Sequence, residues 1–186
     1  EGSSSGNRVI VTDPEGNDFS FIDVPGSIRY VRDSADGLVM VLYTEWDEEL
    51  YRSNYRMLKA DRSGNVIGKY EFEYDNEMYC ERFISFDNGI TVLSDMGSVL
   101  FFNGDGKFIK KTDIDGYNIR FFSSGNGSYV CFNTDNGVQI KKLGFEDQTL
   151  SDVCSLEIKA RDVFDGFGSY DAVFSLSDGL YGYTIS

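Results

Sequence analysis

Residues Ser98–Asp113 read SVLFFNGDGKFIKKTD: an apolar run, a glycine-rich turn and a second alternating run. This pattern predicts a β-hairpin, because Asn, Asp and Gly supply the backbone conformations that a tight turn between two strands needs. The pattern recurs in three other stretches of the chain, Val9–Val24, Arg56–Tyr70 and Val138–Cys154. The sequence therefore predicts an array of β-hairpin repeats.

The turns of the four hairpins are almost evenly spaced. Gly16, Gly64 and Gly106 lie 48 and 42 residues apart (64 − 16 and 106 − 64), and Asp147 holds the equivalent place 41 residues later (147 − 106). A period of about 40–50 residues is typical of the blades of a β-propeller.

The segments between the hairpins repeat as well. Each holds two apolar runs around a turn, as in Ser27–Tyr43, Met78–Leu93, Ile119–Phe132 and Val163–Leu176. A further turn follows at Asp95–Gly97, Asp135–Gly137 and Asp178–Gly179. One repeat is therefore predicted to hold four short antiparallel strands. In the copy that starts at Met78 they are Tyr79–Phe86, Ile90–Ser94, Ser98–Phe102 and Phe108–Thr112.

The predicted fold class is therefore all-β, with antiparallel four-stranded blades like those of a β-propeller. Residues 1–8, rich in Ser and Gly, are expected to form a flexible linker, and residues 9–186 the propeller-like repeat domain. Its predicted parts are a hairpin at 9–24, blades at about 27–75, 78–113 and 119–155, and a partial blade at 162–186.

Two arrangements of these blades are open. Strands from both ends of the chain can share one blade, which gives a small closed ring of four blades. The final run Leu180–Ile185, LYGYTI, is then one strand too many, and the chain stops where the period requires another strand. We therefore expect a partial propeller that belongs to a longer one, with the four-bladed ring as the alternative.

Composition narrows the range of partners. The chain has 31 acidic and 17 basic residues and a formal net charge of −14. Such a surface repels phosphate backbones and anionic lipids, so nucleic acid is not an expected partner. No apolar stretch approaches the ~18 residues that a membrane span needs, and no signal peptide is evident, so no membrane insertion is expected.

The three cysteines do not form a disulfide framework. Cys131 lies in a strand-like run and is expected in the core, whereas a bridge between Cys80 and Cys154 stays open. The core is also expected to hold Phe101, Phe102, Phe121, Phe122 and Phe174.

One polar excursion interrupts the second repeat. Glu45–Asn54, EWDEELYRSN, is interpreted as a solvated segment that contains a helical turn. Trp46, the only Trp, stands there among acids, and Tyr51 and Tyr55 follow it. Because exposed aromatic residues are enriched at binding surfaces, we expect Trp46, Tyr51 and Tyr55 to bind a ligand. The alternative is that Trp46 packs over a strand beside Tyr43 as a lid.

The chemistry of the chain is limited by the absence of His. Without His, catalysis by a Ser-His-Asp or Cys-His arrangement is excluded, and so are most zinc sites. Asp113 and Asp115 resemble part of a calcium loop, but Gly116 comes too early and no Glu follows at the required position. Glu45, Asp47, Glu48 and Glu49 cluster as a charge run. No cofactor, metal or catalytic residue is predicted.

The C-terminal stretch FGSYDAVFSLSDGLYGYTIS resembles a repeat region in surface lipoproteins of Gram-positive anaerobes. The matching residues are Tyr170, Asp171, Ser177, Gly179, Leu180, Tyr181, Gly182 and Tyr183. The turns Asp61–Asn65 and Asn103–Lys107 match the same type of repeat. In those proteins a propeller-like β region accompanies a solute-binding module. The resemblance implies an extracellular, cell-surface location, with a lipid anchor on a segment outside this chain, and a non-catalytic role.

Three functions are compatible with these observations. The first is a non-catalytic binding or scaffolding module of a larger surface protein, which presents loops to a protein or carbohydrate partner. The second is an enzyme of propeller architecture that acts on polysaccharide through carboxylates. The third is a structural spacer.

Overall fold

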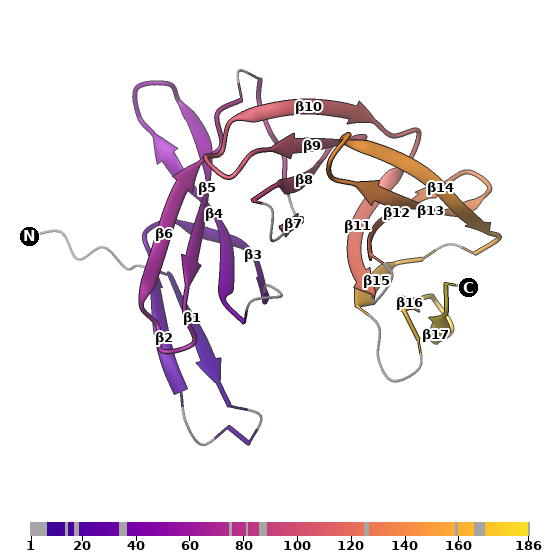
Figure 1. Ribbon diagram of the computed structural model, residues 1–186, viewed down its shortest axis with the longest axis horizontal. Helices are drawn as coiled ribbons and strands as arrows, with labels where there is room; N and C mark the ends of the chain where they lie inside the picture. The colour runs from indigo at the N-terminus through magenta and orange to yellow at the C-terminus, as the bar shows by residue number, and fades with distance from the viewer. Residues whose placement is uncertain are drawn as a thin grey trace, which may run out of the picture. The chain divides into compact units, whose positions relative to one another are not determined.

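The computed structural model describes residues 7–13, 15–16, 19–33, 37–74, 76–80, 82–85, 89–124, 127–158, 160–165 and 170–185. The regular elements of these residues are β-strands, grouped in five sheets that follow one another along the chain (Figure 1). Three of the sheets have four strands in simple sequential order. Antiparallel four-stranded sheets in this succession are the blades of a β-propeller, so the predicted fold class is confirmed.

The first two sheets are built from the N-terminal part of the chain. A two-stranded sheet contains β1 (Asn7–Thr12) and β2 (Phe19–Val24). The first four-stranded sheet contains β3 (Ser27–Asp33), β4 (Val39–Asp47), β5 (Arg52–Ala60) and β6 (Val66–Glu71).

The other three sheets continue the same pattern. The second four-stranded sheet contains β7 (Phe83–Ser85), β8 (Thr91–Asp95), β9 (Ser98–Phe102) and β10 (Phe108–Asp113). The third contains β11 (Tyr117–Ser124), β12 (Gly127–Thr134), β13 (Gly137–Gly144) and β14 (Thr149–Leu156). A three-stranded sheet contains β15 (Asp162–Asp165), β16 (Ala172–Ser175) and β17 (Leu180–Tyr183).

The chain forms two compact units. The first comprises residues 1–81, 85–91 and 102–108, and the second residues 82–84, 92–101 and 109–186. The residues of the sheet β7–β10 are divided between them. In the first unit, the hairpin β1–β2 packs its inner face on the sheet β3–β6, and in the second unit the sheets β11–β14 and β15–β17 share one core.

Two predicted boundaries differ from the structure. Asn7 and Arg8 belong to β1 and not to a linker at residues 1–8, whose first six residues lie outside the described part. The strand expected at Tyr79–Phe86 is reduced to β7, and Phe86 is not among the described residues. Cys80 is not in a strand because its backbone N–H donates to the Tyr55 hydroxyl at 3.0 Å instead of to a neighbouring strand.

The core is aromatic, as the composition suggests. All five residues of β9 are buried, since this strand is covered on both faces. The five expected core residues are buried, which confirms that prediction: Phe101, Phe102, Phe121, Phe122 and Phe174. Cys131 is buried as well. All three cysteines are free thiols, so the Cys80–Cys154 bridge is not formed.

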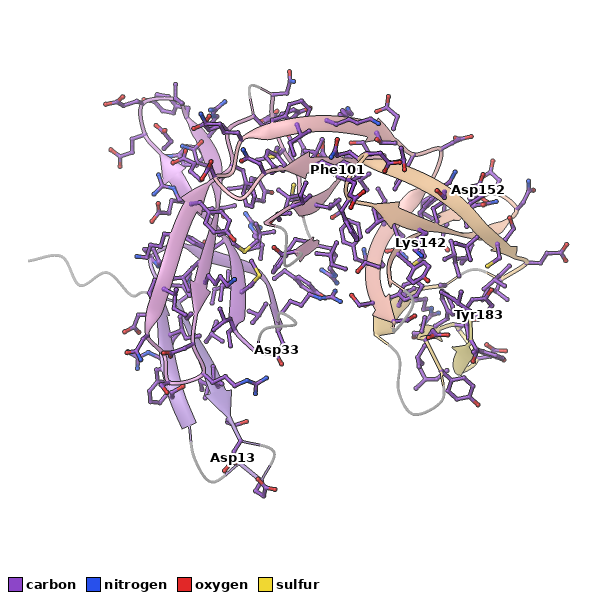
Figure 2. The ribbon with its side chains drawn as sticks, viewed as in Figure 1. Asp13, Asp33, Phe101, Lys142, Asp152 and Tyr183 are labelled. Atoms are coloured by element: carbon purple, nitrogen blue, oxygen red, sulfur yellow. The ribbon has the colours of Figure 1, made fainter. Side chains whose placement is uncertain are left out.

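The repeated turns of the hairpins have the same hydrogen bonds. Gly64 N–H donates to the Asp61 carbonyl at 3.1 Å, Gly106 N–H to the Asn103 carbonyl at 3.0 Å, and Gly16 N–H to the Asp13 carbonyl at 3.0 Å. Asp13 lies at the tip of the β1–β2 hairpin (Figure 2). Each glycine has a positive φ, between 73° and 90°, which favours Gly over other residues.

Two of these turns, those of Gly64 and Gly106, also contact the sheet that precedes them. The backbone of Gly64 lies against the carbonyl of Phe21 in β2, and that of Gly106 against the carbonyl of Glu71 in β6. In both places a Cβ atom would overlap the carbonyl oxygen. The Glu73 N–H also donates a hydrogen bond of 2.8 Å to the Gly106 carbonyl. The turn glycine thus allows close approach of one sheet to the outer strand of the sheet before it.

The third four-stranded sheet makes an equivalent contact without glycine. Its turn contains Gln148, which has a φ of 51°. The carbonyl of Gln148 accepts a hydrogen bond of 2.9 Å from Lys110 Nζ in β10, the outer strand of the preceding sheet. The periodic turns of the sequence therefore mark the joints between successive blades.

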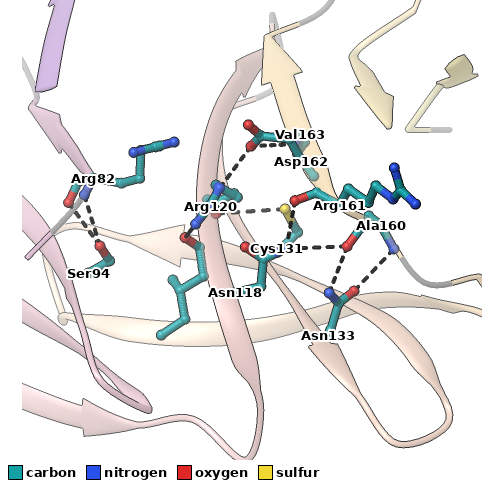
Figure 3. Close-up of polar contacts among 11 residues, drawn as sticks. Arg82, Ser94, Asn118, Arg120, Cys131, Asn133, Ala160, Arg161, Asp162 and Val163 are labelled. Atoms are coloured by element: carbon teal, nitrogen blue, oxygen red, sulfur yellow. Dashed lines mark hydrogen bonds and ion pairs between the residues drawn. The ribbon is translucent and has the colours of Figure 1, made fainter. Parts of the chain in front are cut away.

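Polar side chains link the last two sheets (Figure 3). Asn133, on β12 and buried, donates to the carbonyl of Ala160 at 2.7 Å and accepts from its N–H at 3.2 Å. Arg120 on β11 donates to the carboxylate of Asp162 on β15 at 2.8 Å. Only 14% of the Arg120 side chain is exposed, so this ion pair is partly shielded from solvent.

Candidate functional site

The hairpin β4–β5 extends beyond its sheet. β3 pairs with β4 only as far as Thr44, and β6 pairs with β5 only from Arg56 onward. The Phe72 N–H also donates to the Tyr55 carbonyl at 3.1 Å, so among the described residues only 45–54 pair solely within the hairpin, up to the last pair, Asp47 with Arg52. The loop between these strands is visible in Figure 1. We call residues 45–54 the hairpin extension.

The predicted solvated segment at Glu45–Asn54 agrees with the exposure of Trp46 and residues 48–51, but the helical turn predicted there is wrong. Both β4 and β5 are nine-residue strands, and only residues 48–51 lie between them, in a turn. The physical reason is the side chain of Asp47, which closes the turn.

The Asp47 carboxylate organises the turn. Its Oδ1 accepts hydrogen bonds of 3.0 Å from the N–H groups of Leu50 and Glu49, and its Oδ2 accepts one of 3.0 Å from Asn54 Nδ2. The Leu50 N–H, and then the Asn54 amide and the Glu49 N–H, lower the pKa of Asp47 because they stabilise its ionised form. A two-stranded ribbon alone is only marginally stable in water, so these bonds help to keep the hairpin extension ordered.

The three predicted ligand-binding residues do not share one environment. The structure places Trp46 and Tyr51 on the surface, with 61% and 81% of their areas exposed. Tyr55, in contrast, is 7% exposed, so it does not share the surface position of the other two, and its role in ligand binding stays a prediction. The Tyr55 hydroxyl accepts a hydrogen bond from the Cys80 N–H, and Tyr55 lies on the same buried face of β5 as Met57. The exposure of Trp46 favours the surface position over the lid beside Tyr43.

Leu50 is a further exposed residue that the predicted ligand-binding set does not include. Leu50 lies in the turn and is 58% exposed, next to Tyr51. Its position directly after three acidic residues, away from any alternating run, was the signal that could have placed it in a turn.

An open cleft of about 730 Å³ lies along one side of the hairpin extension. Its walls come from β4, β5, the turn that joins them and the segment between β2 and β3. Its lining residues include Pro25, Trp46, Asn54 and Arg56 together with four carboxylates, Glu45, Asp47, Glu48 and Glu49. Clefts of this volume are in the range that accommodates small ligands.

Charge in the cleft is unbalanced. Arg56 forms ion pairs with Glu45 and, at 3.0 Å, with Glu71, so its positive charge is already neutralised. Glu48 and Glu49 are exposed, and among the described residues their side chains have no ion-pair partner. The cleft is therefore negative and combines carboxylates with one indole side chain.

A second cavity of about 450 Å³ lies in the other unit, along β10 and β13. Asp113 and Asp115, the residues of the partial calcium loop, are in its lining, together with Lys110 and Lys141. Lys141 pairs with Asp152 at 2.8 Å. In the described part of the chain, no group of three or more His, Cys, Asp or Glu side chains is placed to hold a metal ion.

Comparisons with known proteins give information on the fold and none on the function. No protein-family model matches the chain, and no curated protein matches it either. Nineteen chains of solved structures do match. One is a crystal structure of a protein of unknown function from Bacteroides caccae, with a TM-score of 0.63 and 13% identity. The match covers 92% of this chain and 67% of that one. At this identity the likeness shows the fold alone.

Proposed function

We propose that the chain is a non-catalytic binding module of a larger surface protein, and that it presents the hairpin extension to a protein or carbohydrate partner. The observation that carries this proposal is the exposure of Trp46, near the end of β4, and of Tyr51, in the turn whose backbone is held by Asp47. Exposed aromatic side chains on an ordered support are typical of binding surfaces, because they bury much area at a small entropic cost.

The other two four-stranded sheets support this interpretation by contrast. β8 and β9 are joined by two residues, Met96 and Gly97, and β12 and β13 also by two, Asp135 and Asn136. The connection between β16 and β17 has four residues, but every β16 residue that pairs with β17 pairs with β15 as well, so that hairpin has no extension. The corresponding connection in the sheet β3–β6 has a four-residue turn on an extended ribbon. A ribbon that reaches past its sheet adds nothing to the core, so its retention is best accounted for by binding.

The location in this proposal comes from the resemblance to surface lipoproteins. The module would then act outside the cell, attached through a segment outside this chain. Within the described residues, none form a helix with the length and hydropathy needed to cross a bilayer.

The carboxylate enzyme is the less supported alternative. A general acid at neutral pH needs a raised pKa, and the pKa of Asp47, in the cleft, is lowered by its hydrogen bonds. A structural spacer would have no reason to expose Trp46, Leu50 and Tyr51 together.

The test uses the single indole of the chain. Because Trp46 is the only Trp, its fluorescence reports the cleft directly. The protein is titrated with cellulose, xylan and chitin oligosaccharides and with synthetic peptides. We expect a saturable change in Trp46 emission with at least one class. In calorimetry, Trp46→Ala abolishes that binding, whereas Tyr170→Ala, at a site 51% exposed in the other unit, does not. No change with any probe would favour the spacer.

A further inference from the structure

Three apolar side chains are exposed in and next to the turn of the hairpin extension. Trp46, Leu50 and Tyr51 are 61%, 58% and 81% exposed, and they lie within six residues of one another in the sequence. Tyr51 has a φ of 49°, in the left-handed region that β-turn positions use. Trp and Tyr are the residues that most often supply the binding energy of protein interfaces.

Carboxylates surround this apolar group. Residues 45–52 contain four acids, Glu45, Asp47, Glu48 and Glu49, and one base, Arg52. Glu45 is neutralised by Arg56, and Asp47 is satisfied by the N–H groups of the turn and by Asn54. Glu48 and Glu49 therefore carry the charge that faces an incoming partner.

Charge complementarity selects one type of occupant. A second copy of this chain carries the same net charge of −14 and would be repelled. An anionic lipid surface is disfavoured for the same reason. A neutral sugar stacks on an indole but leaves Leu50 uncovered and offers Glu48 and Glu49 no opposite charge. A basic protein surface satisfies both the apolar and the charged groups.

We infer that the partner of the hairpin extension is a protein surface that combines apolar side chains with Lys and Arg. Trp46, Leu50 and Tyr51 insert among the apolar side chains, and Glu48 and Glu49 pair with the basic ones. The inference rests on the proposed binding function and names its partner. Because the charged pairs lie at the rim of the contact, association is steered by charge and weakens with salt.

The probe is a synthetic amphipathic peptide with Leu on one face and Lys and Arg on the other. Its counterpart has Glu in place of every Lys and Arg. Binding is followed through the emission of Trp46, at ionic strengths of about 0.05 M and about 0.5 M. We expect the basic peptide to bind, the acidic counterpart not to bind, and the affinity to fall at the higher ionic strength.

Variants separate the charged from the apolar contribution. Glu48→Lys with Glu49→Lys, and separately Leu50→Ser, are each expected to weaken binding about tenfold or more. The matched control is Glu77→Lys with Glu157→Lys, which makes the same charge change at exposed positions outside the hairpin extension. Near-ultraviolet circular dichroism checks that each variant keeps its fold.

The possible outcomes distinguish failure of the basic partner from failure of the proposed binding function. Equal binding of the basic peptide and its acidic counterpart, or no effect of the charge reversal at Glu48 and Glu49, overturns the basic partner. Binding of oligosaccharides without binding of the basic peptide overturns it too, but leaves the binding module intact. If no probe changes the emission of Trp46, both the partner and the proposed function fail.

Discussion

Replacing Gly106 by Ala tests how successive blades are joined. Gly106 has a φ of 82°, and a Cβ atom there would overlap the carbonyl oxygen of Glu71 in the preceding sheet. Gly16 occupies the equivalent turn of the first hairpin with a φ of 73°, but a Cβ atom there would meet nothing within 4 Å. Gly16→Ala is therefore a matched control for the cost of the backbone conformation alone.

The two substitutions differ by the contact with Glu71. A non-glycine residue at positive φ costs about 1–2 kcal/mol, and the stiffer unfolded chain returns about 0.4–1 kcal/mol, so Gly16→Ala should destabilise by ~1 kcal/mol. At Gly106 the backbone of one sheet must also move, and overpacking of this kind adds about 1–3 kcal/mol. We therefore expect Gly106→Ala to lower the free energy of unfolding by ~2–4 kcal/mol.

Urea-induced unfolding measures the difference. Trp46 lies in the same compact unit as Gly16 and Gly106, so its fluorescence follows the unfolding of that unit. The midpoint should fall clearly further for Gly106→Ala than for Gly16→Ala, with similar slopes. Equal midpoints would show that the turn glycines matter only for their backbone conformation, and would refute the argument that they are contact points between blades.

Three further predictions concern stability and reactivity. Asn133→Ala removes both hydrogen bonds to Ala160; the Ala160 carbonyl still accepts from Asn118 Nδ2, but its buried N–H loses the Asn133 acceptor, so urea unfolding should show a loss of ~1–3 kcal/mol. Burial raises the pKa of Tyr70 from 10.0 to about 12, so its contribution to stability is intact below pH 10 and is lost from pH 10 to 12. Tyr70→Phe should therefore flatten the decline of unfolding free energy over this range, and an unchanged decline contradicts the assignment. Burial also raises the pKa of the Cys131 thiol, so a thiol reagent at pH 8 should label the half-buried Cys154 first; faster labelling of Cys131 would show that the sheet opens.

Much of the fold could be predicted because the turns carry their own chemistry. Gly64 and Gly106 have positive φ, a conformation that favours glycine, and the same two turns contact the neighbouring sheet. The distance between turns along the sequence therefore gives the length of one blade. Runs such as Ser98–Phe102 show a buried strand by composition alone. Neither feature depends on distant residues, which is why both are visible in the sequence.

The candidate site was only partly predictable. Trp46 and Tyr51 stand among acids, and their exposure follows from that setting. Tyr55 was predicted on the surface, but it lies two residues before Met57 in β5. Alternate residues of a strand share a face, so both lie on the buried face. The hydrogen bond of Tyr55 with Cys80 joins residues 25 positions apart, and no local pattern encodes such a partner. The bond between Asn133 and Ala160 was invisible for the same reason.

The joint between blades has a consequence for the history of such chains. Each period encodes both halves of the joint: a turn that meets the strand made just before it, and an outer strand that receives the next turn. A gene segment one period long, copied in tandem, would thus produce a blade already matched to its neighbours. Synthesis on the ribosome benefits too, because every turn emerges after the strand on which it rests.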